Sequence, residues 1–466
     1  MQPYLYCRCF CLSLILFAAS LSTGCAVSSV FNPYPNQAQD YRAAINSQAA
    51  VDEVLKDLES DRDSADAMLY MMERARISQL AGRFDESRKD YQQVIDGFEA
   101  QDLAATVQVS KVGAQGASLL TNDNAIPYEG AGYERIFVHH QQALNYWAKG
   151  DIEGAAVEFR KVALEQRVLE QRYESEIAEA HQEARQNQVP LGEASEQLVG
   201  LDLIAGQVKS SFQNAYTFYQ SAAFWEATGE LNNALVDYKK ALEINPQSDL
   251  IASDIARVSS KLGMSVGKSK TNTPEKDEGT VVLLYEDGFV PARTEIKISV
   301  PNFSDGGIIT IAFPFYGTQN WPKSTPLSVV DDLFNDFGST DPLVDFGALA
   351  VKDLKEQMPA MMVRQVLRGF AKNELQRQSG EQMGAAAQFV ANIYNIVSES
   401  ADRRSWLTIP HTGQALRMNL KEGQRELSLR AMNVTRTLPI EVKAGRTVFV
   451  RVVHVNNALI PQVFPL

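Results

Sequence analysis

The sequence predicts a multidomain protein of the α+β class, in which a solenoid of paired α-helices precedes a β-sandwich-like domain with a helical insertion. Three observations predict this class. Residues 41–262 contain few prolines and many helix formers. Residues 263–279 are polar, without an apolar period, as is typical of an exposed linker. In residues 280–466 the hydrophobic period changes to two, except in a helical segment at about 345–403.

The N-terminus has the composition of a secretory signal peptide over residues 1–24. Arg8 is its only charge, and its apolar run is too short to span a membrane. The run ends at Leu21-Ser22-Thr23-Gly24-Cys25, which resembles the cleavage box of bacterial lipoproteins, with Ser22 where that box usually has leucine. The resemblance implies that Cys25 is acylated and becomes the first residue of the mature chain. An ordinary signal peptide cut near the same place is the alternative.

The residues after Cys25 bear on the location of the protein. Ala26 is not the aspartate that resembles an inner-membrane retention signal in Gram-negative bacteria. The resemblance therefore implies the outer membrane, with the protein facing the periplasm and held by its acyl anchor. Residues 25–40 contain two prolines and several Asn and Gln, and we expect a flexible tether there.

Charge and cysteine content exclude some classes of partner and of stabilisation. The formal net charge is −13, so the chain repels nucleic acid and no nucleic-acid partner is expected. Cys7, Cys9 and Cys11 lie inside the signal peptide, which leaves Cys25 alone after cleavage. No intramolecular disulfide can then form, and stability must come from packed cores.

A pattern of small and aromatic residues around a glycine recurs in the helical half. Residues 218–246 resemble one tetratricopeptide repeat, a helix-turn-helix of about 34 residues. Placing the glycine of this stretch beside two earlier glycines brings similar residue types to the same offsets. Small residues let two helix backbones approach, and the aromatic fills the space beside that contact. The packing residues are Ala75, Gly82, Tyr91, Ala143, Gly150, Ala155, Phe159, Ala222, Gly229, Ala234, Tyr238 and Ala241.

The three copies are unequally spaced, so the predicted stack is interrupted. The interval from Gly82 to Gly150 is about two repeat periods. The sequence therefore leaves open whether a degenerate repeat lies at 100–135. The second part of that region looks more like a loop that enters a helix at Glu134. The next interval holds a long charged helix at about 152–188, whose charges we interpret as a solvated face.

The C-terminal half alternates between strand and helix patterns. We predict strands at 281–285, 295–300, 308–313, 405–409, 415–418, 426–430, 438–442 and 447–453. Helical patterns occupy 345–378, where Pro359 starts or kinks a helix, and 381–403, whose apolar face we interpret as core packing. The glycine turns before the later strands resemble those of small β-sandwich modules on bacterial envelope proteins.

Three stretches carry a resemblance to a known family: GAGYERIFVHHQQALNYWAKGD, LLYEDGFVPAR and RRSWLTIP. The chain resembles a family of Gram-negative lipoproteins that join a tetratricopeptide-like helical half to a β-rich half. The resemblance implies the location and the domain plan, and it implies no reaction.

No sequence pattern indicates a catalytic site. We find no glycine-flanked nucleophile elbow, no GxxxxGK loop, no HExxH and no Cys or His pair with ligand spacing. His139 and His140 point about 100° apart on a helix, which does not suit one metal ion. Asp331 and Asp332 look like exposed loop or helix-start residues. We therefore predict no catalytic residue, no cofactor and no metal.

Two hypotheses from different classes remain. The first is a non-enzymatic, membrane-anchored periplasmic adaptor or scaffold that binds envelope proteins or peptides through the helical groove, in envelope assembly or cell-wall synthesis. The alternative is a hydrolase of envelope polysaccharide or peptide, with its site between Arg403, Arg404 and Trp406 and the loop near Tyr316 and Trp321. We interpret Trp406 as a sandwich-core aromatic. A cleft with convergent groups of shifted pKa would favour the enzyme. The oligomeric state stays open.

Overall fold

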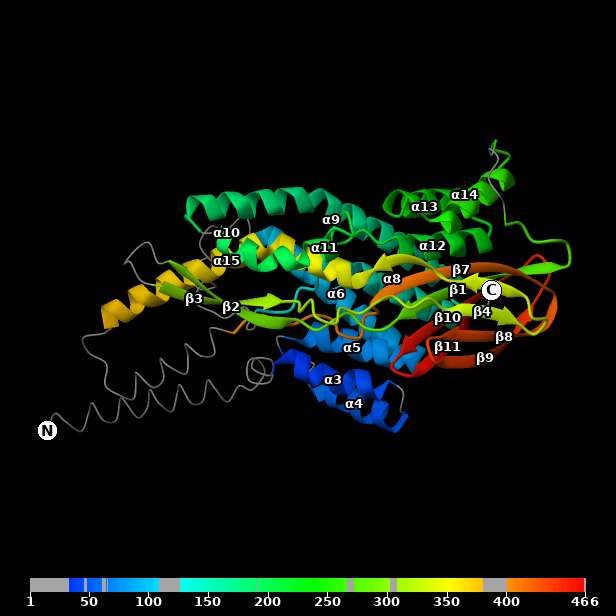
Figure 1. The fold of residues 1–466 in the computed structure, drawn as a ribbon, viewed down its shortest axis with the longest axis horizontal. Helices are drawn as coiled ribbons and strands as arrows, with labels where there is room; N and C mark the ends of the chain where they lie inside the picture. The colour runs from blue at the N-terminus through cyan, green and yellow to red at the C-terminus, as the bar shows by residue number, and fades with distance from the viewer. Residues whose placement is uncertain are drawn as a thin grey trace.

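The computed structural model describes residues 33–45, 48–60, 64, 66–108, 126–189, 191–265, 272–301, 308–379 and 400–464. Cys25 and the signal peptide lie outside these residues. The described part has three layers: paired helices, a five-stranded sheet, and a four-stranded sheet on its other face (Figure 1). The predicted α+β class is confirmed, with a tetratricopeptide-like helical region followed by a β-sheet domain that carries a helix.

Three helical hairpins form the core of the helical layer. They are α5 (Ala67–Leu80) with α6 (Phe84–Gln108), α8 (Gly132–Ala148) with α9 (Ile152–Gln186), and α12 (Ala215–Ala227) with α13 (Leu231–Ile244). Helices α3 (Tyr34–Ala44) and α4 (Gln48–Ser60) precede them, and α14 (Asp249–Lys261) packs on α13 after them. The connection from α9 to α12 contains α10 (Leu191–Leu198), η2 (Val199–Leu201) and α11 (Asp202–Ala205).

The N-terminal tether expected at 25–40 is too long, because helix α3 already begins at Tyr34. Proline is well placed in a first helical turn, where the amide has no helical partner. Tyr34 is 1% exposed, and its hydroxyl donates a hydrogen bond of 2.8 Å to Glu73 on α5. This segment is therefore fixed to the first hairpin.

Each helical hairpin turns at a glycine in the left-handed region. Gly82, Gly150 and Gly229 have φ angles of 78°, 75° and 88°, which glycine adopts without steric cost. In all three turns, the amide after the glycine donates to the carbonyl five residues earlier, as in a Schellman motif. These bonds are Arg83 to Ser78 at 2.8 Å, Asp151 to Tyr146 at 2.9 Å and Glu230 to Trp225 at 2.8 Å. The three hairpins thus share one turn geometry.

The residues expected to pack the repeats are inside the helical layer. The first helices bury Ala75, Ala143 and Ala222, and the second helices bury Ala155, Ala234 and Ala241. The aromatics Tyr91, Phe159 and Tyr238 are also buried. Residues 109–125, which include about half of the possible degenerate repeat at 100–135, lie outside the described part, and α8 begins at Gly132, two residues before Glu134.

The five-stranded sheet has the order β11-β10-β1-β7-β6. Its central strand β1 (Glu278–Asp287) pairs in parallel with β10 (Thr447–Val455) and antiparallel with β7 (Thr412–Lys421). The edges are β11 (Ala458–Phe464) and β6 (Asp341–Asp345). The second sheet is β5 (Asp336–Ser339), β4 (Ser328–Asp331), β8 (Gly423–Ala431) and β9 (Val434–Val442), and β2 (Thr294–Pro301) with β3 (Ile308–Phe315) forms a separate hairpin.

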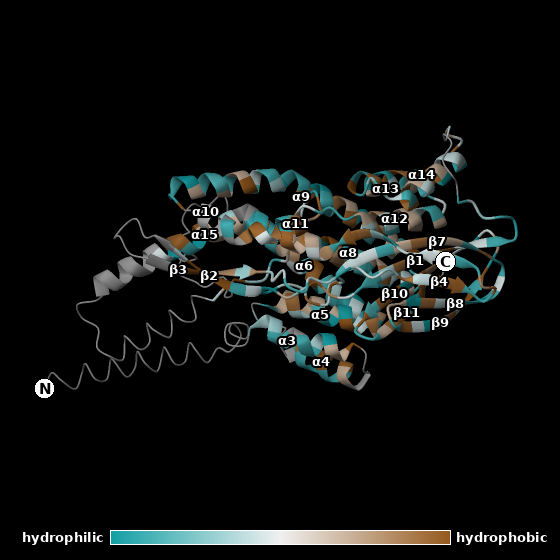
Figure 2. Cartoon of the chain, viewed as in Figure 1, coloured by the Kyte–Doolittle hydropathy of each residue, from teal (hydrophilic) through white to brown (hydrophobic). Residues whose placement is uncertain are grey.

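Strand β1 is buried on both faces. Val281, Leu283 and Tyr285 lie in the core between the two sheets. Val282 and Leu284 belong to the larger core that the sheet shares with the helices. Figure 2 shows hydrophobic and hydrophilic colours mixed along the strands and mainly hydrophilic colours along α9. A single continuous core therefore joins the helical half to the middle sheet.

The helical insertion is helix α15 (Phe346–Ser379), and Pro359 lies within it. Residues 380–399, which contain most of the second expected helix, lie outside the described part. The strand expected at 405–409 is wrong. The amides of Trp406, Leu407 and Thr408 donate to carboxylates of Glu134 and Glu73 on the helices, so they have no strand partner.

Candidate functional site

The sheet of the same chain covers the first helices of the hairpins, α5, α8 and α12, along which a groove of stacked helix pairs runs. The ring of Trp147 on α8 lies 4.3 Å from Phe449 on β10 and 5.6 Å from Phe464 on β11, measured between centroids. A Cβ atom added to Gly413 on β7 would lie 2.7 Å from the ring of Tyr216 on α12. The expectation that partners bind through this groove is therefore corrected, because the groove has no room for a peptide.

A buried charge network fastens these helices to the sheet. Glu286 on β1 accepts hydrogen bonds from Arg76 on α5 and, at 2.9 and 2.8 Å, from Arg451 on β10. Gln141 on α8 accepts from the same two guanidinium groups, at 3.1 and 3.0 Å. Each charge has a partner of opposite sign, so the network fixes the sheet in one position relative to the helices.

Trp406 packs among the helices, and its interpretation as a sandwich-core aromatic is wrong. Its ring lies 6.0 Å from Tyr91 on α6 and 5.5 Å from Phe137 on α8. Its amide donates to Glu134 at 2.8 Å, and the next two amides donate to Glu73. The stretch RRSWLTIP is thus held by two buried helix carboxylates.

A cleft with a volume of about 620 Å³, called the larger cleft below, lies beside this stretch. Its walls come from α6, α8, α9, α15, the loop at 126–131, and residues 211, 212, 293, 402 and 404. The size is typical of ligand pockets. The charged and aromatic lining comprises Asp102, Glu129, Arg135, Arg172, Glu176, Arg293, Asp353, Glu356, Arg364, Asp402, Arg404, Tyr128, Tyr173 and Phe212.

An acid and two arginines meet in the larger cleft. Burial raises the pKa of Asp353 to about 7, although nearby Arg293 opposes the shift. The Arg293 guanidinium lies 3.5 Å from the Asp353 carboxylate and donates to the Tyr316 hydroxyl and to the Arg404 carbonyl, both at 3.2 Å. Gln357 donates to the other Asp353 oxygen at 2.8 Å. These side chains are therefore held by one another.

Arg404 anchors the edge of the larger cleft. It donates to Asp66 at 2.6 Å, to the Ile126 carbonyl at 2.8 Å and to Asp402 at 2.9 and 2.7 Å. Burial alone would lower its pKa, but Asp402 and Asp66 raise it above the usual range for arginine. The loop at 126–131 and the segment before Trp406 are thereby tied together.

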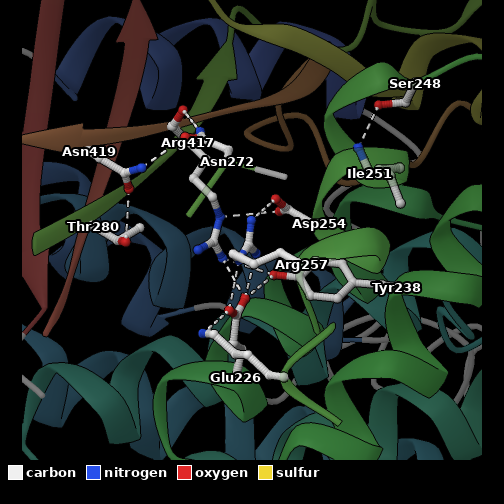
Figure 3. Close-up of polar contacts among 11 residues, drawn as sticks. Glu226, Tyr238, Ser248, Ile251, Asp254, Arg257, Asn272, Thr280, Arg417 and Asn419 are labelled. Atoms are coloured by element: carbon white, nitrogen blue, oxygen red, sulfur yellow. Dashed lines mark hydrogen bonds and ion pairs between the residues drawn. The ribbon is translucent and has the colours of Figure 1, made fainter. Parts of the chain in front are cut away.

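The smaller cleft, of about 440 Å³, lies where the last hairpin meets the sheet. Figure 3 shows Glu226, Tyr238, Asp254, Arg257 and Arg417 converging there. Glu226 on α12 accepts from Arg257 on α14 at 2.9 and 2.7 Å, from Arg417 on β7 at 2.9 Å and from Lys261 at 2.8 Å. This cluster therefore bridges both halves of the chain.

The charges of this cluster set the protonation of its carboxylate. Burial would raise the pKa of Glu226, but Arg417, Arg257 and Lys261 hold it well below its usual range. Asp254 pairs with Arg257 and, at 3.2 Å, with Arg417. Because these arginines pair with acids of the same chain, the cluster is better suited to holding α12, α14 and β7 together than to transferring protons.

The two adjacent histidines have separate structural partners. His139 Nδ1 lies 2.7 Å from Glu158, and His140 stacks on Phe137 at 5.3 Å. Burial and the charge of Arg76 lower the pKa of His140 to about 3, so it is neutral at pH 7. Within the described residues, no group of three or more His, Cys, Asp or Glu could hold a metal ion. Each helix of the described part is too short or too polar to cross a membrane.

The structure brings together some of the residues proposed for the alternative hydrolase. Arg404 and Tyr316 are linked by Arg293, and Trp321 packs on Tyr316 at 6.1 Å. Trp406 contacts the helices as described above. Asp331, expected to be exposed, is 6% exposed and caps a hairpin.

Sequence reasoning missed Asp353, Arg293, Glu226 and Arg417. A usable signal was present for one of them. Arg417 stands in a strand with apolar neighbours, where a buried charge needs a partner. Nothing in the sequence identified that partner, because Glu226 is nearly 200 residues away in the chain.

No protein-family model matches the chain, and the search of curated proteins gives no significant match. Among solved structures, the chain is similar to the TPR2AB-domain:pHSP90 complex of yeast Sti1, at 13% identity and a TM-score of 0.18. The match covers 49% of this chain and 85% of that chain. The helix pairs with their glycine turns and the two packed sheets define the fold as a helical-repeat region packed on a β-sheet domain.

Proposed function

We propose that the protein is a non-enzymatic, lipid-anchored periplasmic adaptor that binds a protein or peptide partner during cell-envelope assembly or cell-wall synthesis. The single observation that carries the proposal is the larger cleft, which lies where the helical layer meets α15, while the groove of the repeats is filled. Its size suits a peptide segment, and its lining combines both charge signs with aromatic side chains.

The charged groups of the cleft are already paired within the chain, which favours binding over catalysis. Asp353, Arg293 and Arg404 bond to groups of the same chain, so their positions are set before a partner arrives. A preformed site loses little side-chain freedom when a peptide binds. The partner's charged groups then meet a fixed pattern of arginines and carboxylates.

A substitution that fills the cleft tests the proposal. Ala360 on α15 lines the cleft, and Ala360→Trp would occupy it. Ala178→Trp on the exposed side of α9 is the matched control. In crosslinking pull-downs of the mature protein from envelope fractions, we expect the control to retain the wild-type partner and Ala360→Trp to lose it. Equal recovery with both variants would count against the cleft.

The lipid anchor is tested separately. Labelling cells with palmitate should mark the wild-type protein and leave the Cys25→Ala variant unlabelled. Label on the alanine variant would contradict acylation at Cys25. Loss of label together with retained partner capture in detergent would support an anchor that is independent of binding.

One observation favours a second candidate, a hydrolase of envelope polysaccharide or peptide. A carboxyl group with a pKa of about 7 can donate or accept a proton near neutral pH, and Glu356 stands three residues away on the same helix. Incubating the mature protein with cell-wall material distinguishes the candidates. Soluble fragments released by wild type and not by Asp353→Asn would favour the hydrolase.

A further inference from the structure

The loop between β4 and β5 presents two apolar side chains to solvent. Leu333 is 54% exposed and Phe334 is 91% exposed. Phe337, three residues further on, packs against the core between the sheets. The hairpin therefore already has an aromatic that faces inward, and Phe334 contributes nothing to that core.

Phe334 also has a backbone conformation that disfavours its side chain. Its φ is 63°, in the left-handed region. Its amide donates to the Asp331 carbonyl at 3.1 Å, and the Asp331 amide donates to the Asn335 carbonyl at 3.1 Å. These bonds are those of a three-residue hairpin loop whose left-handed position is usually glycine. A bulky residue at such a position costs stability.

The loop is held rigidly despite this cost. The Asp331 carboxylate is buried and accepts from the amides of Leu333 at 3.0 Å and Asn335 at 2.8 Å, and from the Asn335 side chain at 2.8 Å. The two apolar side chains are thus presented on a fixed backbone. A preorganised aromatic is the usual form of a binding hot spot.

The charges around the tip define the partner. Asp332 and Asp336 are exposed on either side of Leu333 and Phe334. Arg425 is a nearby cation, 3.6 Å from Asp332. The two exposed aspartates and the acidic net charge of the chain disfavour binding to an anionic membrane surface. It complements a protein pocket that is apolar inside and basic at its rim.

We infer that the tip Leu333–Phe334 is a docking anchor for a partner protein that presents an apolar pocket rimmed by arginine and lysine. This inference rests on the proposed adaptor function and adds a second contact, on the four-stranded sheet. The larger cleft is lined by other elements, so the two contacts can be tested separately.

Photocrosslinking of the full mature chain tests the anchor. A benzoylphenylalanine replaces Phe334 in one variant and Met432 in the control. Met432 is also apolar, exposed (64%) and left-handed (φ 50°), at the turn between β8 and β9. The competing probe is a cyclic peptide of residues 330–337, alongside the same peptide with Phe334→Asn. We expect one protein to crosslink at 334 and not at 432, with only the unmodified peptide competing.

The result supports the inference when the crosslinked residue lies in an apolar pocket with a basic rim, and when Phe334→Asn weakens binding at least about tenfold. Crosslinks to lipid, to a second copy of this chain, to both positions equally or to nothing would overturn it. Partner loss with Ala360→Trp but no crosslink at 334 would leave the adaptor function intact and refute the anchor alone.

A melting temperature separates docking from folding. Asparagine tolerates the left-handed region better than phenylalanine does. Phe334→Asn should therefore melt at the wild-type temperature or above. A lower melting temperature would show that Phe334 serves the fold, and the inference would be wrong.

Discussion

Glu226 on α12 and Arg417 on β7 form an ion pair of 2.9 Å that joins the last helical hairpin to the middle sheet. Both side chains are almost fully buried, and Arg257 and Lys261 share the same carboxylate. Neutralising the acid would leave Asp254 as the remaining partner of the two arginines and would remove the partner of Lys261. Substitution of either residue therefore tests how much this pair contributes to the attachment of the helical half to the sheet.

Glu226→Gln should lower the free energy of unfolding by about 3 kcal/mol at pH 7, because removal of one partner leaves buried charge uncompensated. Urea denaturation measures this loss. Glu243→Gln, on the exposed side of α13, is the control and should change stability little. Equal stability of the two variants would show that the cluster carries no fastening role.

The effect of Glu226→Gln should also depend on pH. The folded pKa of Glu226 lies below its unfolded value, so its stabilisation is fully present above the unfolded pKa of about 4.3. It is lost as pH falls through the folded pKa. The difference between wild type and variant should therefore shrink below about pH 4. A difference that stays constant on acidification would contradict the charge pairing.

Asp353 should show the opposite dependence. Its folded pKa of about 7 exceeds the unfolded value, so the native state binds more protons and wild-type stability falls as pH rises towards 7. Asp353→Asn cannot ionise. Relative to wild type, it should gain about 2–3 kcal/mol between pH 5 and pH 8. Denaturation midpoints at the two pH values measure the change, and no relative gain would mean that Asp353 is ionised throughout.

The left-handed turns give a backbone prediction. A Cβ at Gly229 would touch nothing within 4 Å, so Gly229→Ala tests the φ of 88° alone. We expect a loss of about 1–2 kcal/mol. Gly192 on α10 is equally open but lacks the left-handed angle, and Gly192→Ala should be neutral or slightly stabilising. Thermal melts of both variants compare their stabilities. Equal changes in melting temperature would contradict a specific role for the left-handed angle at Gly229.

Local patterns in the sequence predicted the helical hairpins well. The turn glycines and their flanking alanines act within about 30 residues, and their packing needs only the next helix. Strands β1 and β10 were also expected from their alternation. These features depend on short-range geometry, which a single sequence carries.

The covering of the repeat groove could not be predicted in the same way. Trp147 and Arg451 meet their partners only after strands and helices far apart in the chain adopt one register. Trp406 fits the pattern of a strand, but buried glutamates on two helices take the amides around it. Asp353 lies on a helix whose burial depends on α9, so neither its environment nor its shifted pKa follows from local sequence.

The central claim is that the chain's own sheet fills the groove of its repeats and makes both halves one cooperative unit. Native-state hydrogen exchange of the mature protein tests it most directly. We predict that the most protected amides of α5, α8 and α12 open with the same free energy as those of β1 and β10. If the strands opened at a much lower free energy while the helices stayed protected, the sheet would be able to leave the groove without unfolding of the helices. That result would contradict the account.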